Sequence, residues 1–273
     1  MRCSSIVAAS GVAAVIFSAG CQPSQDHTGA VAELFTGAEW IDMSYPYDES
    51  AIFWPTAKPF ELEVVAAGPT EAGYYYAANN FCMAEHGGTH LDAPIHFSEG
   101  RHTADEIPVE RLIGAAVVVD VSAAAAADPD YQVTAQDLTT WEEQHGRIPD
   151  GSILLVFTGW GVRWGDRASY LGTELTGPEA VPELHFPGLL PEAAEWLVEN
   201  RRIDAFGIDT PSIDYGQSAL FESHQILYAE NVPAFENVAA LDRLPATGAY
   251  VIALPMKIAG GSGGPLRIVG VVP

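Results

Sequence analysis

Apolar residues along the chain occur in short runs separated by glycine, proline and acidic residues, a pattern typical of many short strands. The runs that predict strands are residues 60–68, 73–85, 114–122, 152–159, 203–209, 232–235, 249–255 and 266–272. Because the first third of the chain consists mostly of such runs and of turns, we expect a strand-rich N-terminal part.

Three segments with helical signals interrupt the later strands, at residues 134–145, 191–201 and 218–229. The first follows Thr134 with Asp137 three residues on, a pattern that caps a helix N-terminus. The second helix leads directly into a strand, then a third helix and another short strand follow, which is βαβ-type alternation. The pattern predicts a single α/β domain with a mixed β-sheet and flanking helices. Residues 122–130 are expected to form a surface connection.

The N-terminus has a different pattern, typical of export. Arg2 precedes an apolar run over residues 6–17, which is too short to span a bilayer and fits the core of a signal peptide. The run leads into SAGC, which resembles a bacterial lipobox with Cys21 as the first mature residue, although Ser18 stands where a larger aliphatic residue is usual. An ordinary cleaved signal or a misplaced start codon is the alternative.

These features divide the chain into three parts. We expect a signal peptide with a lipobox-like end over residues 1–21, a tether over 22–36 and the folded domain over 37–273. The mature protein is then exported, and is either periplasmic or a lipoprotein anchored to the membrane through lipidated Cys21. Cys82 is the one cysteine left in the domain, so no disulfide framework exists, and we expect Cys82 to be a small buried core residue.

Composition excludes one class of partner. The chain has 273 residues, 48% of them apolar, which suffices for one large domain or at most two small ones. Acidic residues number 36 against 12 basic ones, a formal charge of −24 that repels phosphate backbones and argues against nucleic-acid binding. The glycine-rich stretch at residues 260–265 lacks the lysine and the following helix of a P-loop, so nucleotide binding is rejected.

Candidate chemistry is concentrated in the stretch EHGGTHLDAPIHF at residues 85–97. His86, His90 and Asp92 have the same parity, so an extended segment directs their side chains to one side. His96 shares this parity, although a proline bends the chain before it. Four polar groups facing an apolar core would be costly without a partner, and a divalent cation bound by imidazoles and a carboxylate removes that cost.

The residues between the histidines fit a metal site. Gly87 and Gly88 permit unusual torsions beside an ion, and Thr89 is expected to hydrogen-bond a ligand and orient it. Three ligands from one segment leave an ion undersaturated, so other residues or water must complete the site. The other candidates are His224 and Glu236, with His102 and His185 competing on equal terms from composition. Asp209 and Ser212 are expected near the site at a strand end.

The stretch HGGTHLDAPIHF closely resembles the HxGTHxDxPxH signature of the metal-dependent cyclase-like hydrolases, a group that includes bacterial kynurenine formamidase and isatin hydrolase. The resemblance extends from about residue 39 to the C-terminus, through WIDMSYPYDESAIFWP, FTGW, GIDTPSID, FENV and LPMKIAGGSGGPLRIV. It implies a cyclase-like domain of the swivelling β/β/α type and a homodimer.

The resemblance also implies a role for each matching residue. The implied metal ligands are His86, His90, Asp92, His224 and Glu236, and Asp92 is the bridge where a second ion is present. His96 matches the catalytic histidine, and Trp54 matches an aromatic residue that contacts substrate. From the residues themselves, Phe53 and the run Tyr74–Tyr76 could extend an aromatic wall, although a core or sheet-surface position is expected for the tyrosines. The cofactor is one or two divalent ions, zinc or manganese, since mixed imidazole and carboxylate ligands suit either.

The expected function is metal-dependent hydrolysis of a small N-acyl aryl amide, such as an aryl formamide, or of a cyclic amide (lactam). A divalent ion lowers the pKa of its bound water from about 16 to about 7, and His96 is the expected general base. The N-terminus indicates export, whereas the formamidases of this family are normally cytoplasmic. This difference leaves the exact substrate open. The alternative is a non-catalytic exported lipoprotein that binds a metal or an aromatic metabolite, in which His96 has no necessary task.

Overall fold

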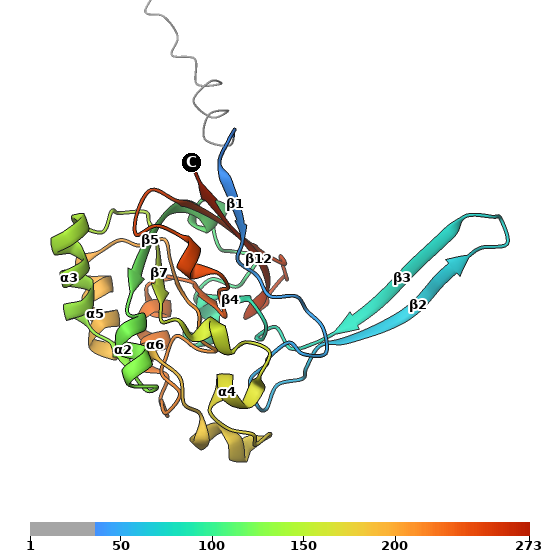
Figure 1. The fold of residues 1–273 in the computed structure, drawn as a ribbon, viewed down its shortest axis with the longest axis horizontal. Coiled ribbons are helices and arrows are strands. Elements are labelled where there is room, and N and C mark those ends of the chain that lie inside the picture. The colour runs from blue at the N-terminus through green and yellow to red at the C-terminus, as the bar shows by residue number, and fades with distance from the viewer. Residues whose placement is uncertain (1–35) are drawn as a thin grey trace, which may run out of the picture.

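The computed structural model describes residues 36–273, so the predicted signal peptide, Cys21 and nearly all of the predicted tether lie outside the described residues. The described part is a mixed α/β fold around one large sheet (Figure 1). Its strand order is β1 (Glu39–Asp42), β12 (Gly263–Val272), β11 (Tyr250–Pro255), β5 (Ile113–Asp120), β7 (Ile153–Phe157), β9 (Ala205–Ile208), β10 (Ala234–Glu236) and β4 (His90–Asp92). β4 also pairs with β12, which closes all of these strands except β1 into a barrel.

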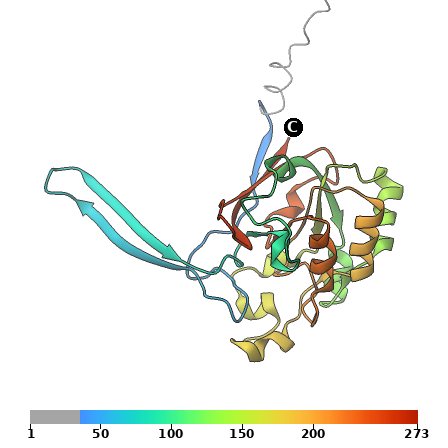
Figure 2. The same ribbon diagram turned by 180° about the vertical axis from the view of Figure 1, so that it is seen from behind.

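The parallel half of the barrel carries the helices. β5, β7, β9 and β10 run parallel to one another, and their apolar runs are mostly buried, as is usual where helices cover a parallel sheet. The helices α3 (Ala135–His145), α5 (Pro191–Asn200) and α6 (Glu222–Ala229) pack against this half (Figures 1 and 2). A second apolar cluster fills the barrel interior, where Leu155 of β7, Phe235 of β10 and Ile268 of β12 are fully buried. The mixed α/β fold is thereby confirmed, and the finer assignment to the swivelling type stays a prediction.

Local sequence explains most of these elements. Thr134 caps α3 through a capping box with Asp137, as the sequence predicts. The expected surface connection at 122–130 is wrong in part, because Ser122–Ala127 form the short helix α2, in agreement with the high helix propensity of its alanines. None of the helices among residues 36–273 has the length and apolarity needed to cross a bilayer.

The remaining elements are short and connect the barrel strands. They are β6 (Gln132–Val133), β8 (Gly188–Leu189), α4 (Arg167–Leu171) and the 3-10 helices η1 (Pro94–His96), η2 (Val109–Leu112), η3 (Trp160–Arg163), η4 (Pro178–Glu183) and η5 (Leu241–Arg243). η1 follows β4 directly and turns the chain away from the sheet, so the segment from His90 to His96 is extended only in its first half.

Two predicted strands leave the body of the molecule altogether. β2 (Glu61–Pro69) and β3 (Tyr75–Cys82) pair only with each other and form a long hairpin that projects outward, which we call the arm (Figures 1 and 2). Cys82 lies exposed at the base of the arm. The expectation that Cys82 is a buried core residue is therefore wrong, because its strand does not join the barrel.

Candidate metal centre

The side chains of the candidate centre converge where β4 is held between two other strands. β10 pairs with β4 in antiparallel register, so that Glu236 lies opposite His90 and both side chains point to the same side. β12 pairs with the other edge of β4 and places Gly263 opposite Asp92. A Cβ atom at Gly263 would lie 2.7 Å from the His86 ring, so this position needs a glycine to leave room for that imidazole.

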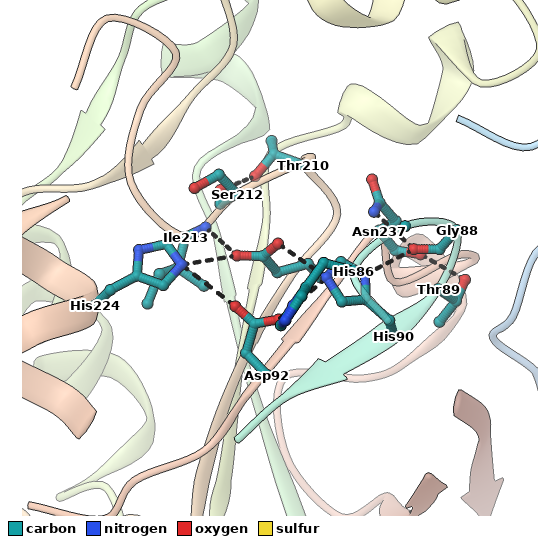
Figure 3. Close-up of polar contacts among 12 residues, drawn as sticks. His86, Gly88, Thr89, His90, Asp92, Thr210, Ser212, Ile213, His224 and Asn237 are labelled. Atoms are coloured by element: carbon teal, nitrogen blue, oxygen red, sulfur yellow. Dashed lines mark hydrogen bonds and ion pairs between the residues drawn. The ribbon is translucent and has the colours of Figure 1, made fainter. Parts of the chain in front are cut away.

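Two groups of three donor side chains meet at Asp92 (Figure 3). The first group is His86, His90 and Asp92, the second is Asp92, His224 and Glu236, and within each group the donor atoms lie within 4.8 Å of one another. Asp92 Oδ1 lies 2.6 Å from His86 Nδ1 and 3.1 Å from His90 Nε2, whereas Asp92 Oδ2 lies 3.5 Å from His224 Nε2. The two carboxylate oxygens of Asp92 therefore face different groups.

Glycine permits the sharp turn that brings His86 back to β4. Gly88 has a φ of 58°, a left-handed conformation that other residues adopt with strain. A Cβ atom at Gly88 would lie 2.5 Å from the Tyr47 ring, and one at Gly87 would lie 2.0 Å from the Phe53 ring. The unusual torsion expected of this glycine pair is found at Gly88, and close packing of aromatic rings is a reason for glycine at both positions.

The His90 ring is oriented by its backbone neighbour. His90 Nδ1 lies 2.9 Å from the carbonyl oxygen of Gly88, which can only accept, so this nitrogen carries the proton in the neutral ring. The same carbonyl accepts a hydrogen bond from Asn237 Nδ2 at 2.7 Å, and Tyr170 in turn donates to Asn237 Oδ1 at 2.8 Å. In the neutral ring His90 Nε2 carries no hydrogen, so it faces the carboxylates buried and without a hydrogen-bond partner; only a protonated ring can donate from it to Asp92.

The other two imidazoles are also held through the nitrogen that faces away from the centre. His86 Nε2 lies 2.8 Å from Ser262 Oγ, and Ser262 donates to Glu85 at 2.7 Å. His224 Nδ1 is hydrogen-bonded to the buried carboxylate of Asp214. Such partners fix the orientation of an imidazole ligand. Sequence reasoning missed Glu85, Ser262 and Asp214, because Ser262 and Asp214 reach the centre only when separate segments pack together, and Glu85 supports His86 through Ser262.

Burial and mutual charge shift the pKa values in the centre in opposite directions. Burial raises the pKa of Asp92, but the charge of His86 and hydrogen bonds from His224, His86 and His90 outweigh it and hold that pKa well below its usual value. Burial and then the charge of Asp92 raise the pKa of Glu236. Burial lowers the pKa of His90, yet the hydrogen bond and charge of Asp92 with the charge of Glu236 raise it to about 9. The buried carboxylates of the centre therefore favour a positive charge between them.

His96 lies beside the donor groups without belonging to either. Its ring stacks on that of His86, with the ring centroids 3.8 Å apart and the planes 17° from parallel. Burial lowers the pKa of His96 to about 4, against the opposing charge of Asp92, so its imidazole is neutral at physiological pH. A neutral imidazole has one nitrogen free to accept a proton.

A cavity of about 360 Å³ opens above the centre. His86, His90, Asp92, His224 and Glu236 lie along it together with His96, and its aromatic wall consists of Phe53, Trp54, Phe97 and Phe221. Trp54 contacts Phe221 edge to face at 6.0 Å between ring centroids. Phe221 has a φ of 53°, unusual for a bulky residue, and strain of this kind is concentrated at functional sites. The sequence pointed to Phe53 and Trp54 and missed Phe97 and Phe221.

Several other candidates lie away from the cavity. Tyr74–Tyr76 are exposed at the outer end of the arm and do not line the cavity, so they form no wall. His185 pairs with Asp130 at 2.8 Å and His102 joins neither donor group, which removes both as competing ligands. Ser212 lines the cavity as expected, but Asp209 does not.

Thr89 and Asp209 serve the framework of the site. Thr89 accepts a hydrogen bond from the backbone of Tyr45 and donates to the carbonyl of Asn237, so the expected contact with a ligand is wrong. Asp209 accepts hydrogen bonds from Thr158 and from the backbone of Trp160, and burial raises its pKa to about 6. Each residue therefore connects its own loop to other loops by hydrogen bonds: Thr89 to those of Tyr45 and Asn237, and Asp209 to that of Thr158 and Trp160.

The chain is similar to characterised proteins over most of its length. The Cyclase family model matches residues 41–215. The isatin hydrolase of Roseibium aggregatum is 38% identical over 209 residues, which covers 74% of this chain and 77% of that protein. A kynurenine formamidase of Bacillus cereus is 30% identical over 234 residues, which covers 85% of this chain and 97% of that protein.

Solved structures show the same fold. Isatin hydrolase A from Ralstonia solanacearum superposes with a TM-score of 0.81 at 32% identity, covering 93% of this chain and 99% of that one. An isatin hydrolase bound to the product analogue thioisatinate gives a TM-score of 0.80 at 32% identity, covering 90% of this chain and 97% of that one. The arrangement of barrel and helices is therefore shared with isatin hydrolases.

Proposed function

The chain belongs to the cyclase family of metal-dependent hydrolases, and on that premise we propose that it opens the amide bond of a small aromatic lactam. Its relatives place it among amidohydrolases that act on C–N bonds other than peptide bonds. The observation that supports the proposal most strongly is the pair of donor groups sharing Asp92 beside a cavity with aromatic walls.

The donor atoms fit a divalent cation. His90 Nε2 is buried without a hydrogen-bond partner, although carboxylate oxygens of Asp92 and Glu236 lie 3.1 and 3.4 Å away. A bound cation satisfies that nitrogen and both carboxylates together. The mixed imidazole and carboxylate donors would suit zinc or manganese, as one ion or two. Such an ion supplies an acidified water and stabilises negative charge on the substrate carbonyl.

Side chains of this protein hold the ion and transfer the proton. His86, His90, Asp92, His224 and Glu236 hold the ion in this proposal. His96 accepts a proton from water and returns it to the leaving nitrogen. Its lowered pKa keeps the ring neutral, which a proton acceptor needs; it weakens the ring as a base and makes the protonated ring a stronger acid toward the leaving nitrogen. Its stacking on His86 keeps the base beside the donor groups. Positioned general bases typically contribute about 10²–10⁴-fold to rate.

The cavity favours a flat aromatic substrate. Its volume of about 360 Å³ suits a small molecule, and the Trp54 and Phe221 rings offer faces and edges for stacking. We assign Trp54 as a substrate contact. A lactam such as isatin is the first candidate, because the isatin hydrolase relative is the more similar in sequence. An N-formyl aryl amide is the second, because the kynurenine formamidase relative is covered almost completely.

The proposal is tested by hydrolysis of isatin and of N-formylkynurenine by the purified protein, before and after removal of metal with a chelator. We expect turnover of isatin that disappears with the chelator and returns when Zn²⁺ or Mn²⁺ is added. Metal analysis of the same samples identifies the ion and its stoichiometry. Metal binding without turnover of any aryl amide or lactam would favour the alternative of a non-catalytic binding protein.

We further propose that the enzyme works outside the cytoplasm, through the signal over residues 1–21 and a lipid on Cys21. The support is the SAGC stretch that ends the apolar run. Fractionation of cells that express the full chain should place it with membranes facing the periplasm, and Cys21→Ser should abolish incorporation of labelled fatty acid. Recovery of the unprocessed protein in the cytoplasm would contradict the assignment.

A further inference from the structure

One hydroxyl in the cavity wall has no partner within the protein. Ser212 is 4% exposed and lines the cavity, and its hydroxyl makes no hydrogen bond to any of residues 36–273. The contact drawn to Ser212 in Figure 3 comes from Thr210 and ends on the carbonyl oxygen of Ser212, at 2.8 Å. A serine hydroxyl can both donate and accept hydrogen bonds, so this group can bind a molecule that enters the cavity.

The other polar side chains of the cavity wall are already engaged. Asn237 donates to the carbonyl of Gly88 and accepts from Tyr170. The histidines and carboxylates that line the cavity belong to the two donor groups, except for His96, the proposed base. The rest of the described wall is apolar. Ser212 therefore carries the polar side chain that remains available to orient a substrate.

The backbone holds Ser212 firmly in the wall. Its carbonyl accepts the hydrogen bond from Thr210, which is fully buried. The N–H of the next residue, Ile213, donates to Glu236 Oε1 at 2.8 Å, and the Ile213 carbonyl accepts from the N–H of Leu189 at 2.6 Å. A hydroxyl on a segment fixed at so many points meets a substrate with little further loss of conformational entropy.

Ser212 and His96 lie beside different donor groups. His96 stacks on His86, which belongs to the first group. Ser212 lies beside the second group, because the N–H of Ile213 donates to Glu236. The carbon of a scissile amide carries the leaving nitrogen on one side and the acyl substituent on the other. When the nitrogen lies toward His96, the acyl substituent therefore points toward Ser212.

We propose that Ser212 determines specificity: its hydroxyl donates a hydrogen bond to a second carbonyl on the acyl side of the scissile amide. The inference rests on the proposed hydrolysis and narrows its substrate class. A lactam with an adjacent ketone, as in isatin, offers this carbonyl, whereas a formamide carries only a hydrogen atom there. A substrate without it displaces water from the hydroxyl and leaves the hydroxyl unpaired in an apolar wall, which weakens binding.

The variant Ser212→Ala removes the hydroxyl oxygen alone. We expect kcat/KM for isatin to fall about 10-fold and kcat/KM for formanilide to stay unchanged, because formanilide has no second carbonyl. The metal content should stay that of the unmodified protein, since the hydrogen bond from Ile213 to Glu236 comes from the backbone. Equal losses for the two substrates, or no loss for isatin, would overturn the proposal.

Ser152 provides a matched control for loss of a buried hydroxyl. It is 1% exposed, donates to the carbonyl of Pro149 at 2.7 Å and does not line the cavity. Ser152→Ala should lower the urea midpoint of unfolding and leave both substrates unaffected. Ser212→Ala should leave the midpoint unchanged, because it removes no hydrogen bond within the protein. A midpoint lowered as much as in Ser152→Ala would show a structural role for Ser212 and overturn the proposal.

A binding measurement tests Ser212 without turnover. One probe is the diketone in which a methylene group replaces the nitrogen of isatin, and the other is the monoketone that keeps only the carbonyl matching the isatin amide. Calorimetry with the metal-loaded protein should show tighter binding of the diketone, and Ser212→Ala should reduce this preference about 10-fold. No preference, or the same preference in the variant, would overturn the role of Ser212. Failure of the unmodified protein to hydrolyse any amide would contradict the proposed function, and the two probes would still decide the role of Ser212.

Discussion

The two donor groups of the candidate metal centre differ in how the chain builds them. His86, His90 and Asp92 come from one short segment around β4, whereas the second group adds His224 from α6 and Glu236 from β10 to the same Asp92. The first group is also more open, because the His86 side chain is 21% exposed while those of His224 and Glu236 are 3% and 5% exposed. We call them the open half and the sealed half of the centre.

The supporting contacts differ in the same sense. In the open half, His86 Nε2 is hydrogen-bonded to the hydroxyl of Ser262, and that hydroxyl donates to the carboxylate of Glu85. In the sealed half, His224 is held by Asp214, a buried carboxylate that also accepts from the backbone of Ser223 and of His224. Both halves line the cavity, but only the open half has a partly exposed donor, His86, whereas the sealed half is held by a buried carboxylate. Substitutions in the two halves should therefore affect different properties.

The largest effect is expected where the halves meet. Asp92→Asn removes the negative charge from both groups at once and leaves His86, His90 and His224 without their common carboxylate. We expect the purified variant to lose bound metal from both halves and to lose more than about 10⁴-fold in turnover, beyond the loss of a general base. Asp150→Asn on the surface is the control. Full metal content in Asp92→Asn would contradict the shared role of Asp92.

The next largest effect separates catalysis from metal binding in the open half. His96→Ala removes an imidazole that stacks on His86 but belongs to neither donor group. We expect turnover to fall by about 10²–10⁴-fold while the metal content stays that of the unmodified protein. His185→Ala, at an exposed ion pair, is the matched control for loss of a histidine. Unchanged turnover in His96→Ala would exclude it as the base.

A pH effect on stability is expected from His90, which faces carboxylates of both halves. Its pKa of about 9 in the folded, metal-free protein lies above the usual 6.5, so the bound proton stabilises the fold. That contribution is complete below about pH 6.5 and is lost as pH rises through about 9, a change on the order of 3 kcal/mol.

Urea unfolding of the chelated protein across this pH range measures the loss. With saturating metal the loss should vanish, because the ion takes the place of the proton. Parallel pH profiles with and without metal would show that proton and ion do not compete at this nitrogen.

The smallest expected effects distinguish the supports of the two halves. Ser262→Ala should weaken metal binding roughly 10-fold and leave the stability of the metal-free protein unchanged, because His86 is partly exposed. Asp214→Asn should weaken metal binding by a similar factor and also cost about 1–3 kcal/mol of unfolding free energy, because several buried donors lose a charged acceptor. Metal titration and urea unfolding of both variants, with Ser50→Ala as a surface control, give the comparison. Equal loss of stability in both would remove the distinction between open and sealed halves.

Sequence reasoning was most successful where local spacing carries the information. The donor atoms of His86, His90 and Asp92 lie together as predicted, but the extended conformation behind that prediction holds only for residues 90–92, and a turn at Gly88 brings His86 back to them. The strand runs were also recognised, since alternating or continuous apolar runs mark strands wherever they finally pair. Cys82 and the tyrosines of the arm show the limit, because strand propensity alone does not reveal whether a strand is buried.

The chemical character of this protein can be read from the order of its residues, which contains the donors of the open half, the neighbouring His96, the excess of acidic residues and the family signature. Composition left His102, His185, His224 and Glu236 as equal candidates, and the family resemblance favoured the last two; the tertiary structure brings His224 and Glu236 to the centre. The tertiary structure also adds Phe97 and Phe221 to the cavity wall and sets β2 and β3 apart from the barrel. The physical reason is the distance along the chain over which each kind of interaction acts. Side-chain parity acts over a few residues, whereas closure of the barrel through β4 and β12 depends on packing of the whole chain.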